Sequence, residues 1–364
     1  MNSIISVVTP SYNQAEFIAD TIESVLSQEG DFYIDYVIID GGSNDGSSDI
    51  IDRYEKALKE NCRMETISDL CFYVAEKPFH LNRCKGISYR WISEKDKGHG
   101  DALNKGFSRS IGDIMCWLNS DDMYLDNAFQ SITEIYRQFN QVKWVVGQNC
   151  SFNKDGSLRS CTYLEKCRYK NIFSFLTHNY EWIQQEGTFW RRDLWQKAGG
   201  KINTDYKLMV DGELWCRFFL HENLYHVHKE LGGFRYHDTN RAHLFMPQVR
   251  SEMARAISGL ARQVPVQTRE FAENLLANAP VQEIRHERLN FKIIEKKPKA
   301  TEWQISEVDF FAYSLKEQAE LIRRTLNNLE YKTGSRLITP LRWAIRSARK
   351  MVIGAASFFR RISA

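Results

Sequence analysis

The stretch Met115-Cys116-Trp117-Leu118-Asn119-Ser120-Asp121-Asp122 decides the fold of this chain. The run from Ile114 to Leu118 carries no charge and stops abruptly at polar residues, which predicts a buried strand. Open α/β sheets bind ligands at the carboxyl ends of their strands, so the two aspartates stand where a site is expected. Carboxylates suit Mg²⁺ or Mn²⁺ that carries a diphosphate. The alternative is an ordinary turn in which Asp122 or Asp126 caps the next helix.

Strands and helices alternate on both sides of this stretch. Apolar residues at helical spacing separate the predicted buried strands, which lie at residues 4–8, 36–39, 88–93 and 144–147. This order implies parallel strands joined by right-handed crossovers. We therefore expect an α/β fold with a mostly parallel central sheet flanked by helices. Residues 61–86 show no periodicity and are expected to form an irregular insertion.

Length and composition describe an ordinary globular protein. The chain has 364 residues, 43% of them hydrophobic, enough for one large or two modest domains. Its net charge of +3 is too small to indicate nucleic-acid binding. The eight cysteines form no CxxC pair and no Cys/His metal spacing, so we expect a reduced, cytoplasmic protein. The N-terminal apolar run at residues 4–8 is short and uncharged, so we expect no signal peptide, and no apolar run is long enough to span a bilayer.

Six blocks of the chain resemble, in order, glycosyltransferase family 2, whose members are inverting enzymes with the GT-A fold. The resemblance covers about residues 3–246 and is absent from the C-terminal third. Each block alone is weak, and their common order makes the resemblance specific. The blocks are Thr9-Pro-Ser-Tyr-Asn13, Ile39-Asp40-Gly-Gly-Ser-Asn-Asp-Gly46, Ser93-Glu-Lys-Asp-Lys-Gly98 with Asp101-Ala-Leu-Asn-Lys-Gly106, Trp117-Leu-Asn-Ser-Asp-Asp122, residues 185–192, and Asp211-Gly-Glu-Leu-Trp215.

The resemblance implies a site for a nucleotide-diphosphate sugar, with UDP as the expected nucleotide. Asp40 would bind the nucleobase or ribose, although a turn or helix-capping aspartate is the alternative. Asp96 would face the ribose or sugar, and Lys105 would reach a phosphate unless it is an ordinary solvated lysine. The full set of donor-binding candidates is Thr9, Pro10, Tyr12, Asp40, Gly42, Asp96, Lys105, Asn119, Ser120 and Asp121.

The same resemblance implies a Mn²⁺ or Mg²⁺ ion held by Asp121, Asp122 and His237. The ion would offset the charge that develops on the departing diphosphate. The family often has aspartate where this chain has Asn119, so one negative charge is missing from this motif. His237 follows Arg235 in an Arg-x-His pattern, with a surface histidine as the alternative.

Asp211 is the expected general base, which removes the proton of the acceptor hydroxyl as that oxygen attacks the sugar. Glu213 competes for this role. Positions two apart on a helix point to different faces, so both carboxylates are not expected to reach one hydroxyl. The other alternative places Asp211 as a helix cap.

An aromatic stretch is expected to form the acceptor side of the site. Gln185, Phe189 and Trp190 would line it, because aromatic faces stack on sugars and exclude water. Trp190 could equally be a core residue, and for Trp215 we expect the core.

Two further segments follow the catalytic domain, which is expected to span residues 1–246. Residues 247–334 are expected to form a helical extension. Residues 335–364 lack acidic side chains and predict an amphipathic helix with a basic face, typical of an interfacial membrane anchor. The alternative is a helix that packs on the catalytic domain or in a homo-oligomer. The expected location is the inner face of the cytoplasmic membrane.

The sequence thus predicts an inverting glycosyltransferase that moves a hexosyl or N-acetylhexosaminyl group to an acceptor hydroxyl in cell-surface polysaccharide or glycolipid assembly. Its acceptor would be a glycan or a lipid-linked sugar. A nucleotidyltransferase of similar fold is one alternative, but Thr9 to Asn13 is not a glycine- and arginine-rich triphosphate loop. A catalytically degenerate nucleotide-sugar binder or scaffold is another, and Asp211 with the intact aspartate pair argues against it.

Overall fold

The computed structural model describes residues 3–162, 183–263, 281–287 and 290–296. All of these residues belong to one compact unit. The predicted tail helix at 335–364 lies outside the described residues, as does most of the extension predicted at 247–334.

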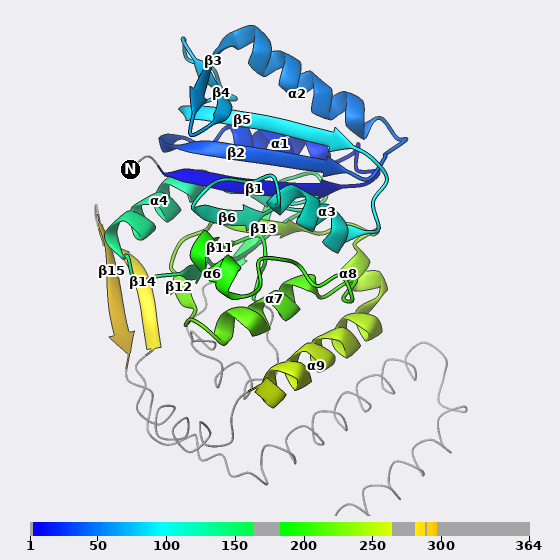
Figure 1. The fold of residues 1–364 in the computed structure, drawn as a ribbon, viewed down its shortest axis with the longest axis vertical. Coiled ribbons are helices and arrows are strands. Elements are labelled where there is room, and N and C mark those ends of the chain that lie inside the picture. The colour runs from blue at the N-terminus through cyan, green and yellow to red at the C-terminus, as the bar shows by residue number, and fades with distance from the viewer. Residues whose placement is uncertain (1–2, 163–182, 264–280, 288–289, 297–364) are drawn as a thin grey trace, which may run out of the picture. The chain divides into compact units, whose positions relative to one another are not determined.

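A parallel group of strands forms the middle of the central sheet (Figure 1). Strand β1 (Ile4–Ser11) runs parallel to β2 (Gly30–Asp40) on one side and to β6 (Ile114–Trp117) on the other. Strand β5 (Cys84–Ser93) continues the parallel group beyond β2. The carboxyl ends of these strands therefore lie at one edge of the sheet, which confirms the predicted α/β architecture.

The eleven-stranded sheet extends beyond β6 through shorter strands. Strand β11 is antiparallel to both β6 and β8, and β12 is parallel to β8 and to β14. The last two strands form an antiparallel hairpin inside the segment that we expected to be helical, so that expectation is wrong there. The bounds are β8 (Trp144–Val146), β11 (Thr188–Arg191), β12 (Tyr225–Val227), β14 (Val281–Glu287) and β15 (Asn290–Lys296).

The insertion expected to be irregular at 61–86 contains a regular hairpin. Strands β3 (Cys62–Ile67) and β4 (Leu70–Ala75) pair antiparallel and add to the sheet beyond β5. Their two-residue turn, Ser68 and Asp69, has φ of 51° and 63°. Two consecutive positive φ angles match the right-handed twist of hairpin strands. Neither turn residue is glycine, so this segment lacks the usual residue pattern of a tight hairpin turn.

A second, four-stranded sheet includes β7, the strand that follows β6 in the chain. Its order is β10 (Leu158–Thr162), β9 (Asn149–Phe152), β13 (Gly232–Arg235) and β7 (Met123–Tyr124). The hairpin predicted around residues 153–156 joins β9 to β10, as expected. Cys150 and Cys161 form a disulfide across this hairpin, so the expectation that all cysteines are reduced is not met in the structure.

Helices lie on both faces of the central sheet (Figure 1). Their apolar stripes face inward, as α4 shows with Phe129, Ile132 and Ile135 fully buried. The bounds are α1 (Ile18–Leu26), α2 (Ser47–Asn61), α3 (His99–Phe107), α4 (Ala128–Gln138), α6 (Arg192–Lys197), α7 (Val210–Phe219), α8 (Arg241–Leu244) and α9 (Met246–Gln263).

Helix α9 packs beside α7, although it lies beyond the domain boundary predicted at residue 246. Glu252 of α9 accepts hydrogen bonds from the backbone N–H groups of Lys207, Leu208 and Met209 at 2.9, 2.9 and 3.1 Å. A carboxylate at this position satisfies the free N–H groups that precede α7. Residues 246–263 are thus part of the unit that positions α7 and Asp211.

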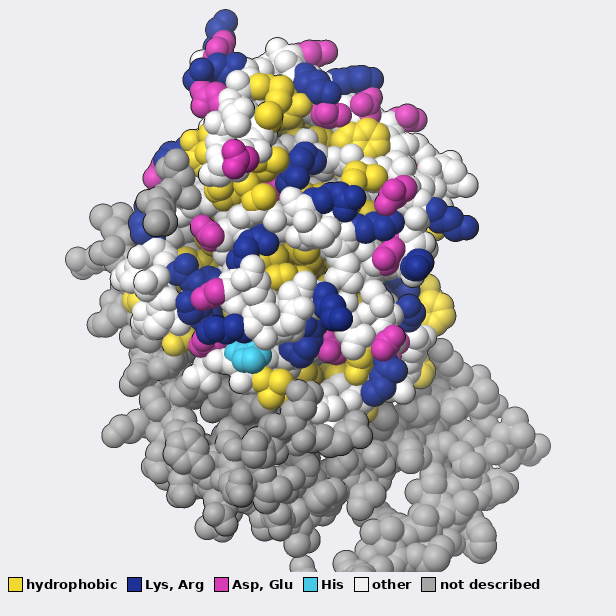
Figure 2. Space-filling model, in the orientation of Figure 1, with side chains coloured by type: hydrophobic (Ala, Val, Ile, Leu, Met, Phe, Trp, Pro, Cys, Tyr) yellow, Lys and Arg dark blue, Asp and Glu magenta, His cyan; other side chains and the backbone are white. Residues whose placement is uncertain are grey.

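Acidic and basic side chains are interspersed over the face of the molecule shown in Figure 2. This pattern agrees with the small net charge of +3. Within the described part of the chain, no helix is both long and apolar enough to cross a membrane.

Candidate functional site

Asp121 and His237 meet at the carboxyl edge of the parallel strands. Asp121 follows β6, and His237 follows β13 of the small sheet. The Oδ2 atom of Asp121 lies 3.0 Å from Nε2 of His237. Phe17 stacks on the His237 ring with a centroid distance of 4.5 Å. The structure therefore brings together two of the three predicted metal ligands.

Neighbouring residues orient the ring of His237. Asn240 accepts a hydrogen bond from the His237 backbone N–H through Oδ1 at 2.8 Å, and its Nδ2 lies 2.7 Å from His237 Nε2. The other ring nitrogen, Nδ1, lies 2.8 Å from Thr239 Oγ1. These contacts hold Nε2 toward the carboxylate of Asp121, where the nitrogen could ligate a cation once it carries no proton.

This arrangement fits a divalent cation. Two ligands on neighbouring corners of an octahedral ion at about 2.1 Å lie about 3.0 Å apart, which is the separation of Asp121 Oδ2 and His237 Nε2. No group of three His, Cys, Asp or Glu side chains among the described residues encloses an ion. Mg²⁺ and similar ions in nucleotide sites usually take few protein ligands and complete their shell with phosphate and water.

Asp122 lies inside the protein, behind Asp121. Its side chain is 0% exposed, and its oxygens accept hydrogen bonds from the Arg235 backbone N–H at 2.9 Å and from Asn119 Nδ2 at 3.0 Å. Burial raises the pKa of Asp122 well above its usual range, and the charges of Asp121 and Glu186 act in the same direction. The structure thus contradicts its prediction as a direct metal ligand and gives it the task of holding the loop that carries Asp121.

Asp40 is also buried, which differs from its predicted contact with the donor. It is 0% exposed, and its carboxylate accepts hydrogen bonds from Gly42 N–H, Ser43 N–H and Ser93 Oγ at 3.2, 3.0 and 2.6 Å. Gly42 has φ of +81°, which allows the backbone to turn back toward this carboxylate. Asp40 therefore shapes the turn after β2, the alternative left open by the sequence.

Two predicted donor residues pack closely against this turn. A Cβ atom placed on Gly41 would lie 2.9 Å from Asp96 Oδ2 and 3.3 Å from Tyr12 Cδ2, so Asp96 and Tyr12 approach the same part of the backbone and leave no room for a side chain at position 41. Tyr12 is 61% exposed and offers a ring face, whereas Thr9 and Pro10 are buried in β1. The other oxygen of Asp96 accepts the Gly98 N–H at 2.7 Å, which fixes the carboxylate. Of the predicted donor residues, Tyr12 and Asp96 are accessible here.

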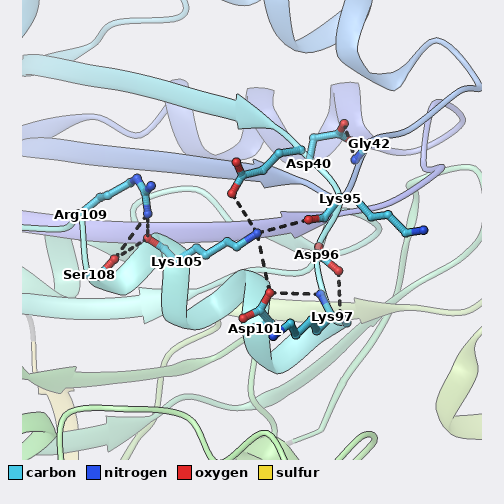
Figure 3. Close-up of polar contacts among 11 residues, drawn as sticks. Asp40, Gly42, Lys95, Asp96, Lys97, Asp101, Lys105, Ser108 and Arg109 are labelled. Atoms are coloured by element: carbon cyan, nitrogen blue, oxygen red, sulfur yellow. Dashed lines mark hydrogen bonds and ion pairs between the residues drawn. The ribbon is translucent and has the colours of Figure 1, made fainter.

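Lys105 is held by carboxylates on the same side of the site (Figure 3). Its Nζ lies 2.8 Å from Glu94 Oε1 and 3.7 Å from Asp101 Oδ2, and it donates to the Lys95 carbonyl at 3.5 Å. The Glu94 contact raises the pKa of Lys105. An ammonium with these partners is already neutralised. The structure thus does not present Lys105 as a free phosphate ligand.

Asp211 and Glu213 have different surroundings at the start of α7. Glu213 pairs with Arg217, one turn later, through contacts of 2.8, 3.0 and 3.1 Å. Asp211 forms no ion pair with any residue that the structure describes. Burial raises the pKa of Asp211 to about 6, against the lowering effect of nearby backbone N–H groups. Asp211 thus suits proton transfer near neutral pH, and Glu213 does not.

Glu186 is a site residue that the sequence analysis missed. It is 5% exposed and lies just before β11. Burial raises its pKa, and the charges of Asp211 and Asp121 raise it further. The carboxyl group of Glu186 therefore lies within electrostatic range of both residues. The sequence feature that could have identified Glu186 is its position in Gln185-Glu186-Gly187, directly before the aromatic strand β11.

The predicted acceptor wall is part of the core instead. Phe189 and Trp190 are 0% exposed. Trp190 packs against Trp117 and Trp215 with centroid distances of 5.5 and 5.8 Å. Gln185 is 6% exposed and donates to the Trp117 carbonyl at 2.6 Å. None of the three offers a surface to an acceptor, because β11 is covered on both faces; Trp215 is a core residue as expected.

Comparison with known proteins identifies related sequences. The sequence profile of glycosyl transferase family 2 matches residues 6–68 and 75–195, half of the chain. An uncharacterized glycosyltransferase of Nostoc sp. is 23% identical over 65% of this chain and 66% of its own length. A Bacillus subtilis glycosyltransferase named for teichuronic acid biosynthesis is 26% identical over 42% of this chain and 46% of its own length. The chain thus spans less than two thirds of each relative.

A solved structure shows the same fold. S. aureus TarS, residues 1–349, in complex with UDP-GlcNAc, superposes with a TM-score of 0.53 at 14% sequence identity. The match covers 76% of this chain and 71% of that chain. At this identity the likeness concerns the fold, which is the expected GT-A fold.

Proposed function

Because this chain belongs to glycosyl transferase family 2, we propose that it transfers a sugar from a UDP-linked donor to an acceptor hydroxyl with inversion, as a metal-dependent enzyme. The observation that carries this proposal is the 3.0 Å contact between Asp121 Oδ2 and His237 Nε2 at the carboxyl ends of the parallel strands, where a cation that carries a diphosphate is expected. The charges of Asp121 and Asp211 both raise the pKa of the buried Glu186, which supports placing the diphosphate at Asp121 and the acceptor at Asp211 in one acidic region.

Each accessible residue has a role in this proposal. Tyr12 and Asp96 would hold the nucleoside, since they lie side by side at Gly41 and the Tyr12 ring is exposed. Asp121 and His237 would hold Mn²⁺ or Mg²⁺, which supplies positive charge to the diphosphate as it leaves. Asp211 would accept the proton of the acceptor hydroxyl as its oxygen attacks the anomeric carbon from the side opposite the diphosphate.

The biological setting of the proposal is cell-surface polysaccharide or glycolipid assembly with a glycan or lipid-linked acceptor. The name of the Bacillus subtilis relative supports this setting. Hexosyl or N-acetylhexosaminyl transfer is the proposed specificity, and the TarS complex with UDP-GlcNAc supports testing that donor first.

Donor binding should depend on a divalent cation and on Asp121. We expect Mn²⁺ to increase the stabilisation of wild-type protein by a nucleotide sugar, because ligands that bind only the folded state raise the melting temperature. A thermal-shift screen of UDP-GlcNAc, UDP-glucose and GDP-mannose with and without Mn²⁺ measures this.

Asp121→Asn should lose the Mn²⁺-dependent part of the shift, since an amide is a weaker cation ligand than a carboxylate. Asp126→Asn, in the connection between β7 and α4, is the control and should keep it. Equal Mn²⁺-dependent shifts in wild type and Asp121→Asn would contradict the proposed ion site. Donor binding without turnover for any acceptor would favour a scaffold.

We also propose that residues 335–364 attach the protein to the inner face of the cytoplasmic membrane. Seven basic residues and no acidic ones support an interaction with anionic lipid: Arg336, Arg342, Arg346, Arg349, Lys350, Arg360 and Arg361. Truncation after Gly334 should abolish co-flotation with phosphatidylglycerol vesicles and preserve the donor-dependent thermal shift. Vesicle binding that survives the truncation would assign the segment to packing or oligomerisation instead.

A further inference from the structure

His99, the first residue of α3, lies among the residues of the donor side and has no role in the mechanism above. Its Nε2 atom lies 3.0 Å from Asn119 Oδ1. The charged groups that act on its ring are Arg241, Asp121 and Asp96, which come from three separate parts of the chain. Burial lowers the pKa of His99, so the ring is neutral at neutral pH. A neutral ring at this position can donate one hydrogen bond and accept one.

A chain of hydrogen bonds fixes which nitrogen carries the proton. Gln185 Nε2 donates to the Trp117 carbonyl at 2.6 Å, and a backbone carbonyl can only accept. Gln185 Oε1 therefore faces Asn119, whose Nδ2 lies 3.5 Å away. The same Nδ2 donates to Asp122 Oδ2 at 3.0 Å. These two acceptors orient the Asn119 amide so that its Oδ1 faces His99.

It follows that His99 donates through Nε2–H and that Nδ1 carries a lone pair. No described residue forms a hydrogen bond with Nδ1. Asn119 is essential to this arrangement because it accepts from His99 and donates toward Gln185 and Asp122. An aspartate at position 119 could only accept when ionised, so it could not bridge these groups in the same way. The neutral amide of Asn119 thus links His99 to Gln185 and Asp122.

We propose that His99 contacts the donor and that its Nδ1 accepts a hydrogen bond from a hydroxyl group of the nucleotide sugar. The inference rests on the proposed function, since Asp96 and Asp121 are assigned there to the nucleoside and the diphosphate. A lone pair on a neutral ring attracts a hydroxyl hydrogen and repels phosphate oxygens. The hydroxyl belongs either to the ribose or to the transferred sugar, and these two sources can be separated by experiment.

The test compares His99→Phe, His99→Gln and wild type by calorimetric titration with UDP-GlcNAc, UDP-glucose and UDP in the presence of Mn²⁺. Phenylalanine keeps a ring but removes both nitrogens, so we expect an increase of about tenfold in Kd for the nucleotide sugar. Glutamine can donate to Asn119 and accept from the donor, and should restore affinity to within about threefold of wild type. His80→Phe, at an exposed position between β4 and β5, is the matched control and should bind as wild type does.

The UDP titrations identify the hydroxyl. Weaker binding of the nucleotide sugars with unchanged UDP binding assigns it to the sugar, and equal weakening of both assigns it to the ribose. Wild-type affinities in His99→Phe, with an unchanged melting temperature without ligand, would overturn the inference and leave the proposed function standing. A wild-type protein that binds none of the three ligands would overturn both. Equal losses in His99→Phe and His99→Gln would also contradict the role assigned to Nδ1.

Discussion

Asp211→Asn is expected to lower kcat by about 100- to 10,000-fold, the usual contribution of a general base. The amide has nearly the shape of the carboxylate but cannot accept the proton of the acceptor hydroxyl. Asp211 forms no ion pair with any described residue, so the substitution breaks no such contact. Steady-state kinetics with the donor found by thermal shift measures the effect.

Glu213→Gln is the matched control, two residues along the same helix. Glu213 is paired with Arg217, and its side chain is only 12% exposed, so it has little access to an acceptor. We expect this variant to keep most of its kcat. If Glu213→Gln is inactive and Asp211→Asn is active, then Glu213 is the general base and Asp211 is not.

The pH dependence of the wild type gives a second measure of the same assignment. Burial raises the pKa of Asp211 to about 6. A general base must be ionised, so kcat/KM should fall about tenfold per pH unit below that value and level off above it. The residual kcat/KM of Asp211→Asn should not show this fall at low pH.

Asp35→Ala is expected to lower the free energy of unfolding by about 3–5 kcal/mol, the range for breaking a buried ion pair. Asp35 is 0% exposed and accepts hydrogen bonds from Ser6 Oγ at 2.7 Å and from the Ile111 N–H at 2.8 Å. It also pairs with Arg90, whose side chain is 32% exposed. Removing the carboxylate leaves these donors without their partner inside the protein. Urea unfolding measures the loss.

Asp31→Ala is the control for this substitution, because Asp31 lies on the same strand but its side chain is 60% exposed. Its contacts with Lys85 and Arg137 are at the surface, where solvent screens them. We expect its urea midpoint to match that of wild type. If Asp35→Ala unfolds no earlier than Asp31→Ala, the buried network does not stabilise the sheet as described.

The sequence predicted the parallel strands correctly because β1, residues 36–39 of β2, and β6 are uncharged apolar runs that end in polar turns. It failed where the same residue types serve two purposes. Phe189 and Trp190 are residue types that suit a sugar-binding wall, yet side chains packed on both faces of β11 bury them. The β3–β4 hairpin was missed because its turn, Ser68 and Asp69, contains no glycine.

The sequence predicted where the site residues lie along the chain, but it did not predict their hydrogen-bond partners. The sequence placed Asp40 and Asp122 at strand ends, whereas only the structure shows that backbone N–H groups occupy their carboxylates. Glu186 and His99 were missed because their importance comes from neighbours far away in sequence. Asp211 and Asp121 belong to motifs that the family shares, so they could be named from the sequence.

The central claim is that Asp211 takes the proton of the acceptor while the donor is held elsewhere, at Asp121 and His237. The most direct test measures donor Kd by calorimetry and kcat by product formation in the same preparation of Asp211→Asn. The account predicts a donor Kd within about twofold of wild type and a kcat lowered at least about 100-fold. An Asp211→Asn enzyme with wild-type kcat, or one whose lost activity is explained by lost donor binding, would contradict it.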